Sequence, residues 1–584
     1  MLSGKKIAPK LLPIVATILM VILAACGGST GQTTTTAHTP LPQSKQVYYS
    51  GAMAGVADIK TFDPALSTDA FSIYAIDDVF TGLVELNDKL NVQNQLASSY
   101  HVSSDGTTYT FTLRSGLKFS DGTPLTSADV VYSINRALDP ATASPTGPYY
   151  LHYIKDSAKL GVKGGVTTLI GDSLLAPTPT TVEIITDKAY SFFLDALTYS
   201  CSYVVEKSLV EKYPKTWTDH LTEGGGDGPW MVKQYQHNKQ IVLVPNPTYY
   251  GPHPKLSELV YQFYQNAPTV YQSYLANQVD DTYVPTQYYQ QDKTRSDFHQ
   301  TPVLQINYYS MNFLKKPFDN VDIRQAFELA INKDLIVKSV WSGSFIATNH
   351  IVPAGMPGYN PNLTGPDGVK GTAGDPTLAA QLFKTGLQQE GYSSVSALPS
   401  ITLTYSSGGD QATKNEVAAL QQMWQSTLGV SVKTDDIDFN TLIGDTSQGA
   451  ANPLMFFSGP AWIADYPDPQ DWTSLQFCNG CAQNGMNYGQ NHSTDATAQQ
   501  QVQQQLAQAD VAPLGNARLQ MYEKAEQQLV NDVAWLPMEQ AVGLGLRKPC
   551  VQGVVDNAEG LTPPNDWGNI YLSTDTPCGP TTML

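Results

Sequence analysis

The feature that most restricts the fold of this chain is a helix pattern that runs directly into a strand pattern near residue 430. Residues 415–428 have a helical pattern, Gly429 supplies the stop that glycine gives at a helix C-terminus, and residues 430–434 are typical of a strand. A helix that passes through one glycine into a strand is the junction used in layered α/β domains. The sequence therefore predicts an α/β protein.

Other segments support a mixed fold. Residues 108–113 place Tyr, Phe and Leu on one face and threonines on the other, which predicts a half-buried strand. Thr126 and Asp129 have the spacing of a capping box, and apolar residues continue at helical spacing to Leu138. We expect further helices from near Asp322, over the glutamine-rich surface segment around 499–505, and over 518–530.

Length and charge limit the possible architectures and partners. With 584 residues, the chain is too long for one hydrophobic core and is expected to form two or three domains. The formal net charge of −18 argues against nucleic acid as a partner, because phosphate binding needs a basic surface. The same charge opposes electrostatic binding to an anionic membrane.

The N-terminus predicts export. Three lysines precede an apolar run at 11–25, which is shorter than the ~20 residues of a membrane-spanning helix. We interpret residues 1–25 as a signal peptide; an uncleaved anchor helix is the alternative. Leu23-Ala-Ala-Cys-Gly27 resembles the lipobox of bacterial lipoproteins, which implies lipidation at Cys26 on the outer face of the cytoplasmic membrane. Residues 26–45 are small and polar and predict a flexible tether.

Five cysteines follow the predicted lipidation site. Cys478 and Cys481 form a lone CxxC with no second pair and no matching histidines, so a small disulfide loop is favoured over zinc. Cys550 and Cys578 are candidates for a second disulfide near the C-terminus. Cys201 is then left without a partner.

Residues 461–472 (AWIADYPDPQDW) concentrate three aspartates with two tryptophans and a tyrosine. Carboxylates beside aromatic rings serve acid/base catalysis, sugar stacking or capture of a cationic ligand. Glycosidases hold two acids ~5–9.5 Å apart, and the spacing of Asp465 and Asp468 does not by itself establish that geometry. Metalloprotease, nucleophile-elbow, P-loop and dinucleotide motifs are absent, and the nine histidines are scattered. We therefore predict a binding protein, not an enzyme, with no cofactor and no metal.

Several segments together resemble one known family. They are Gly82-Leu-Val-Glu85, the stretch SSDGTTYTFTLRSGLKFSDGTPLTSADVVYSINRAL at 103–138, NPTYYG at 246–251, PFDNVDIRQA at 317–326 with AINK at 330–333, and AWIADYPDP at 461–469. In this order they resemble the extracellular solute-binding proteins of family 5, the oligopeptide, dipeptide and nickel receptors of ABC importers. The resemblance extends over essentially the whole mature chain.

The resemblance implies a two-lobed, clamshell-like α/β receptor of the periplasmic-binding-protein type (class II, cluster C) with an additional subdomain. The implied boundaries are lobe I at 46–75, 223–305 and 538–584, the subdomain at 76–222, and lobe II at 306–537. Much of the conspicuous motif at 103–138 falls in the subdomain, so it identifies the family without marking the binding site.

The resemblance also implies site residues. Asp465 matches the aspartate that pairs with the α-ammonium of a bound peptide, Trp462 would form an aromatic wall, and the main chain of Ala461 and Trp462 would pair with the peptide as a strand does. Tyr466 belongs to the same predicted site. Charge-assisted hydrogen bonds to a carboxylate in a closed cleft are strong, which suits an amine-bearing ligand.

The remaining aspartates of the segment have structural interpretations. Asp468 lies between two prolines and is expected to shape a turn through its own backbone. Asp471 is expected to cap a helix that begins at Trp472.

Two further places are candidates for ligand contact. Phe62 and Asp63 lie in a segment that resembles a cleft loop of the family, although a plain turn explains them as well. Tyr149 and Tyr150 are weaker candidates. The position three before the tryptophan is Gly459, where some peptide receptors have arginine, so no basic residue is assigned to hold a ligand carboxylate.

We therefore predict a lipid-anchored, monomeric receptor that captures peptides and delivers them to the permease and ATPase subunits of an ABC importer. An oligosaccharide is the main alternative solute, and nickel or haem is a weaker one because the histidines are poorly grouped. An adhesin or chaperone-like receptor without a transport role is a third class that the sequence leaves open.

Overall fold

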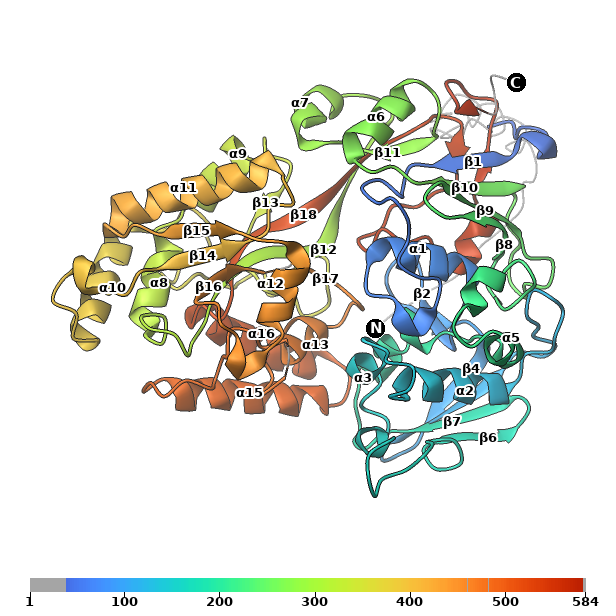
Figure 1. The fold of residues 1–584 in the computed structure, drawn as a ribbon, viewed down its shortest axis with the longest axis horizontal. Helices are drawn as coiled ribbons and strands as arrows, with labels where there is room; N and C mark the ends of the chain where they lie inside the picture. Colours follow the sequence, from blue (N-terminus) through green and yellow to red (C-terminus); the bar gives the residue numbers. More distant parts are fainter. Residues whose placement is uncertain (1–37, 460, 482, 581–584) are drawn as a thin grey trace, which may run out of the picture. The chain divides into compact units, whose positions relative to one another are not determined.

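The computed structural model describes residues 38–459, 461–481 and 483–580 (Figure 1). The predicted signal peptide, lipidation at Cys26 and the first part of the tether lie outside these residues. Within the described ranges, no helix combines the length and the apolar character that a membrane crossing requires.

A four-stranded sheet forms the base of the first lobe. Its strand order is β1-β10-β9-β8, with β1 parallel to β10 and the other pairs antiparallel. The strands are β1 (Val47–Ser50), β8 (Trp230–Gln236), β9 (Gln240–Pro245) and β10 (Glu258–Gln262). Helix α1 (Ala70–Val79) buries Ala75, Ile76 and Val79 in the same core as this sheet. The sheet thus unites segments that lie about 200 residues apart.

A second antiparallel sheet has the order β4-β5-β7-β6. Its strands are β4 (Ala97–Val102), β5 (Thr108–Leu113), β6 (Leu174–Thr178) and β7 (Thr181–Ile185). Strand β5 buries Tyr109, Phe111 and Leu113, as its alternation predicts. Helix α2 (Ser127–Leu138) begins at the predicted capping box, in which Asp129 accepts a hydrogen bond from the backbone of Thr126.

Shorter elements complete this part of the chain. They are β2 (Val84–Leu86), β3 (Val92–Asn94), α3 (Gly147–Tyr150), α4 (Phe193–Ala196), α5 (Lys207–Lys212), α6 (Ala267–Leu275), α7 (Tyr289–Asp292), β19 (Val551–Gln552) and β20 (Tyr571–Leu572).

An eight-stranded mixed sheet forms the core of the second lobe. Its main path is β11-β18-β12-β16-β14-β15, and β13 and β17 pair outside it. The strands are β11 (Asp281–Tyr283), β12 (Phe298–Met311), β13 (Ile346–Ala347), β14 (Thr402–Tyr405), β15 (Lys433–Asp436), β16 (Phe456–Ser458), β17 (Trp462–Ile463) and β18 (Leu536–Arg547). The helices around it are α8 (Val321–Leu329), α9 (Lys333–Ser339), α10 (Pro376–Gln389), α11 (Gln411–Leu428) and α12 (Phe439–Thr446). The apolar faces of α8, α9, α10 and α11 share one core with β14 and β16, whereas Leu442 of α12 packs in a separate core.

The long strands β12 and β18 join the two lobes. They run side by side and antiparallel from Phe298↔Leu546 to Tyr309↔Leu536, and their register shifts near the middle (Figure 1). One end of this ladder pairs with β11, close to the first lobe, and the other pairs with β16. The predicted α/β class therefore takes the form of two sheet-based lobes connected by a strand pair.

The segment that led to the α/β prediction differs in one detail. Helix α11 ends as expected, with Gly429 in the left-handed conformation at φ 70°. The following strand was predicted at 430–434, but β15 begins at Lys433. Val430 and Val432 are buried in the core instead, and pairing with β14 starts only after the chain has left that core.

The last helices are α13 (Pro469–Trp472), α14 (Ser474–Phe477), α15 (Ala496–Asp510) and α16 (Asn516–Asn531). The structure joins Cys478 to Cys481 and Cys550 to Cys578. Cys201 is a buried free thiol, and burial raises its pKa.

Candidate functional site

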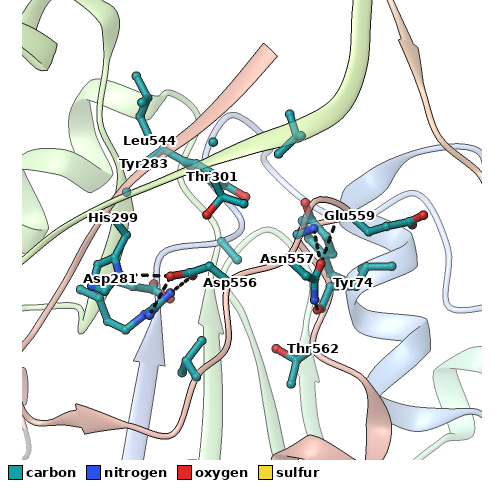
Figure 2. Close-up of a pocket in the computed structure, with 18 of the residues that line it drawn as sticks. Tyr74, Asp281, Tyr283, His299, Thr301, Leu544, Asp556, Asn557, Glu559 and Thr562 are labelled. Atoms are coloured by element: carbon teal, nitrogen blue, oxygen red, sulfur yellow. Dashed lines mark hydrogen bonds and ion pairs between the residues drawn. The ribbon is translucent and has the colours of Figure 1, made fainter. Parts of the chain in front are cut away.

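A cavity of about 550 Å³ lies where the two lobes meet. It is lined by the end of β1, by α1, by β11, β12, β17 and β18, and by the segment 554–562 (Figure 2). Ligand sites in proteins have volumes of about 300–1,000 Å³ and occur preferentially at domain interfaces. The size and position of this cavity therefore suit a small solute held between the lobes.

One side of the cavity has an ion-paired cluster. Arg547 at the end of β18 pairs with Asp556, and His299 Nδ1 lies 3.1 Å from Asp556 Oδ2 (Figure 2). Burial raises the pKa of Asp556, but the hydrogen bonds from His299 and Arg547 outweigh it and hold this pKa at about 2. Asp556 therefore stays ionised, and its ion pair with Arg547 leaves fewer of the guanidinium N–H groups for a ligand.

Two other lining carboxylates are held by neighbours in the first lobe. Asp281 accepts hydrogen bonds from the Tyr48 hydroxyl at 2.5 Å and from the Gly51 amide at 2.5 Å. Asp78 accepts a hydrogen bond from the Tyr261 hydroxyl at 2.8 Å. Burial raises the pKa of Asp78 to about 7, against the lowering effect of this hydrogen bond. These acids have protein partners and help to shape the wall.

Asp465 lies just after β17, which pairs with β12. Its backbone amide donates to Asp471 Oδ2 at 3.1 Å, and the Tyr150 hydroxyl of α3 donates to its carboxylate. The side chain is half-buried, and burial raises its pKa to about 7 while the Tyr150 hydrogen bond lowers it. Among the described residues, no Lys, Arg or His forms an ion pair with Asp465. A cation placed here would relieve the cost of burying this carboxylate.

The contact between Asp465 and Tyr150 joins segments far apart in the chain. A second hydrogen bond of 3.0 Å runs nearby from Gln470 Nε2 to the Tyr153 hydroxyl. Tyr466 is fully buried in the same contact, with its ring stacked against Phe192 at 6.4 Å. The residues after β17 therefore pack on α3 and its neighbours, and the Tyr466 side chain serves this packing.

The prediction for Asp471 was wrong. The helix begins at Pro469, three residues earlier than expected, and its cap is Asp468, which accepts from Gln470 N at 2.9 Å. Asp471 lies inside this helix and accepts a hydrogen bond from Trp462 Nε1 at 3.2 Å, in addition to the one from the Asp465 amide. Burial, followed by the charge of Asp465, raises the pKa of Asp471. Asp471 thus positions two predicted ligand residues.

The interpretation of Asp468 as a turn residue was incomplete. Its two carboxylate oxygens lie 2.6 and 2.8 Å from the guanidinium of Arg518 in α16. Both side chains are buried, with 8% and 1% of their surface exposed. This bidentate ion pair ties the segment after β17 to α16, so the backbone around Asp465 rests on a fixed support.

The comparisons with known proteins agree with this arrangement. A family model described as bacterial extracellular solute-binding proteins, family 5 middle, matches residues 91–484. The chain belongs to this family.

Relatives of this family 5 protein include the oligopeptide-binding protein OppA of Bacillus subtilis, which is 29% identical over 70% of this chain and 74% of the relative. The periplasmic oligopeptide-binding protein OppA of Escherichia coli is also 29% identical, over 82% of this chain and 84% of the relative. The structure of the Escherichia coli murein tripeptide binding protein MppA matches with a TM-score of 0.74 at 23% identity, covering 92% of this chain and 100% of that chain. The predicted two-lobed clamshell fold is confirmed.

The other predicted residues of this family 5 protein have different surroundings. Trp462 is half-buried against the core of the β4-β5-β7-β6 sheet and against a core of the second lobe, and Ala461 has a left-handed backbone at φ 62°. Phe62 is buried edge-on against Tyr235. The residues that line the cavity include Ile463 but none of the predicted ligand residues, which are Phe62, Asp63, Ala461, Trp462, Asp465 and Tyr466.

The carboxylate of Asp63 is already bound within the first lobe. Its oxygens lie 2.8 and 2.5 Å from Arg136, and Trp217 Nε1 donates to it at 3.1 Å. It also accepts from the Ala65 amide at 3.1 Å and caps a short 3-10 helix. These contacts favour the plain turn that the sequence left open.

Several cavity residues had no signal in the sequence. Asp77, His299, Arg547, Asp556 and Glu559 line the cavity, yet they come from distant segments and belong to no recognisable motif. The composition offered one hint, because Lys and Arg are sparse and acids predominate. Only the tertiary fold brings these five side chains to one cavity.

Proposed function

We propose that this protein is a lipid-anchored, extracytoplasmic receptor that binds peptides between its lobes and delivers them to an ABC importer. The observation that supports the proposal most directly is the Asp465 carboxylate, which is half-buried and, within the described part of the chain, has a hydroxyl but no cation as its partner. The relatives named above are oligopeptide- and tripeptide-binding proteins, which is consistent with a peptide ligand. A peptide supplies the missing cation as its α-ammonium group.

Strand pairing supplies the second part of the proposed site. β17 pairs with β12 through Trp462 and Ile463, and within the described residues its opposite edge has no strand partner. An extended peptide can add to such an edge through main-chain hydrogen bonds, with its side chains in neighbouring pockets. We infer that the main chain of Ala461 and Trp462 receives the peptide next to Asp465.

The proposed lobes meet at the long strands. The predicted lobe I comprises 46–75, 223–305 and 538–584, the subdomain comprises 76–222, and lobe II comprises 306–537. The boundary at 75/76 would divide α1, whose Ala75, Ile76 and Val79 all pack in the core of the first lobe's sheet. These boundaries place both crossings within β12 and β18, near the register shifts. Closure would be a hinge motion at these strands, favoured because the ligand contacts both lobes in the closed state.

Lipidation at Cys26 would hold the receptor at the outer face of the cytoplasmic membrane, and residues 26–45 would act as its tether. Its partners would be the permease and ATPase subunits, which supply the energy for transport. The receptor itself would act as a monomer and carry out no chemical reaction on its ligand.

A thermal-shift screen with a peptide library and an oligosaccharide panel tests this function. A ligand that binds the folded state raises its stability by RT ln(1 + [L]/Kd). We expect short peptides with a free N-terminus to raise the melting temperature in a concentration-dependent way. The peptide function is refuted if the sugars stabilise the protein and no peptide does.

A further inference from the structure

The charges that line the cavity are strongly unbalanced. Its described walls carry five carboxylates and one guanidinium, with His299 beside them; the carboxylates belong to Asp77, Asp78, Asp281, Asp556 and Glu559. The guanidinium is that of Arg547, which is already paired with Asp556. A buried carboxylate is costly unless it is neutralised or paired. The cavity therefore favours a cationic ligand.

Asp77 and Glu559 differ from the other three acids because each retains an oxygen without a partner. The Asp77 side chain comes from α1 and the residue is 9% exposed; within the described structure, its enclosed Oδ1 has no hydrogen-bond partner. The enclosed Oε1 of Glu559 likewise has none in the described part of the chain. Other buried acids of the described structure, such as Asp471 and Glu539, also have such an oxygen, but among the acids that line the cavity only Asp77 and Glu559 do, so a cation bound in the cavity could satisfy them.

Glu559 lies within electrostatic range of the proposed ammonium site and of Asp77. Burial raises the pKa of Glu559 to about 8, and the nearby charges of Asp465 and Asp77 raise it further. Burial, followed by the charge of Asp78, raises the pKa of Asp77. Figure 2 shows Glu559 on the side of Tyr74 of α1, away from the cluster of His299 and Asp556. When it is ionised, Glu559 is thus repelled by both Asp465 and Asp77.

We propose that Asp77 and Glu559 form a second cation subsite beside Asp465, which receives the basic side chain of a peptide whose first residue is lysine or arginine. This inference rests on the proposed function, because Asp465 must hold the α-ammonium. The first residue is the one implied, since its side chain is the nearest to that ammonium. Its cation would give the two unpaired oxygens a partner and reduce their mutual repulsion.

Calorimetric titration of the whole mature receptor with three tripeptides tests the proposal. The peptides are Lys-Ala-Ala, norleucine-Ala-Ala and Ala-Ala-Lys. Norleucine-Ala-Ala lacks the side-chain charge of the first residue, and Ala-Ala-Lys carries that charge on the third residue instead. We expect Lys-Ala-Ala to bind at least about tenfold more tightly than the norleucine peptide. Ala-Ala-Lys should lack most of this advantage, because its cation lies far from the first subsite.

Two substitutions assign the preference to these acids. Glu559→Gln and Asp77→Asn should each reduce the lysine preference several-fold while affinity for the norleucine peptide changes by less than about threefold. Glu211→Gln is a matched control, because that side chain is 61% exposed on α5. Should Asp77→Asn fail to fold, Glu559→Gln and the wild-type comparison still decide the question.

The outcomes separate the two proposals. If norleucine-Ala-Ala binds as tightly as Lys-Ala-Ala, or if both variants keep the full preference, the second subsite is refuted and peptide binding stands. If no tripeptide or longer peptide binds, the proposed function fails and the subsite fails with it.

Discussion

Replacing Asp465 by Asn tests whether this carboxylate binds an ammonium group. Asparagine keeps the size of the side chain and an oxygen that can accept the Tyr150 hydrogen bond, but it removes the negative charge. The expected result is a selective loss of affinity for peptides with a free N-terminus. A peptide whose N-terminus is acetylated has no ammonium and should bind the variant and the wild type alike.

The size of the effect follows from the environment of Asp465. Its pKa is raised to about 7, so about half of the empty receptors are protonated at pH 7, and removing that proton costs about 0.4 kcal/mol. A hydrogen bond to a charged group contributes about 1.5–3 kcal/mol. The net loss for Asp465→Asn is therefore about 1–2.5 kcal/mol, a weakening of about 5- to 60-fold.

The assay is calorimetric titration of both receptors with one peptide in free and acetylated forms. The difference between the two losses isolates the ammonium contact from any general change in the cleft. Thermal melts without ligand check that the variant is folded. An equal loss for the free and the acetylated peptide would disprove the ion pair, and so would no loss for either.

Three further predictions follow from the same contacts. The pKa of Asp465 is near 7 in the empty receptor and is lowered by a bound ammonium, so peptide affinity should rise up to about tenfold per pH unit as the pH increases toward 7. It should fall again above about pH 8, where the peptide α-amino group loses its proton. Binding titrations across pH 5–9 check this, and an Asp465→Asn receptor whose affinity still rises between pH 5 and 7 would contradict it. Asp468→Asn removes the ion-pair partner of the buried Arg518 and should lower the free energy of unfolding, measured by urea denaturation, by about 3–5 kcal/mol. The double variant Asp468→Asn, Arg518→Met should recover part of this loss. A single variant as stable as the wild type would contradict the prediction. Asp471→Leu removes the hydrogen-bond acceptor of Trp462 Nε1 and of the Asp465 amide. Free and acetylated peptides should therefore both bind about tenfold more weakly in fluorescence titrations. A loss of affinity for the free peptide alone would show that Asp471 acts through its charge instead.

Local patterns in the sequence were sufficient where a segment carries its own physical signal. The alternation at 108–113 places three apolar side chains in the core, and the Thr126–Asp129 box begins α2 as predicted. Helix and strand propensity, capping and hydrophobic periodicity act within a few residues, so neighbouring residues are sufficient to predict such an element. The same locality explains the correct helix end at Gly429.

Predictions that needed a distant partner were less accurate. The start of β15 depends on where β14 lies and on which valines the core takes, and neither is visible in residues 430–436. Asp468 and Asp471 have other roles than expected because Arg518 and the Trp462 indole, supplied by other elements, determine what each carboxylate does. A carboxylate binds the nearest available donor in space, whatever its position in the chain.

The sequence by itself determined the family and the α/β class, because motifs and turn chemistry are short-range. The tertiary structure alone decided which side chains share the cavity. β1, α1, β11, β12, β18 and the segment 554–562 meet there although they are separated by up to about 500 residues. Asp77 and Glu559 differ from the other acids of the cavity wall by an enclosed oxygen without a hydrogen-bond partner in the described structure, and this is a property of the assembled space that has no counterpart in the linear sequence.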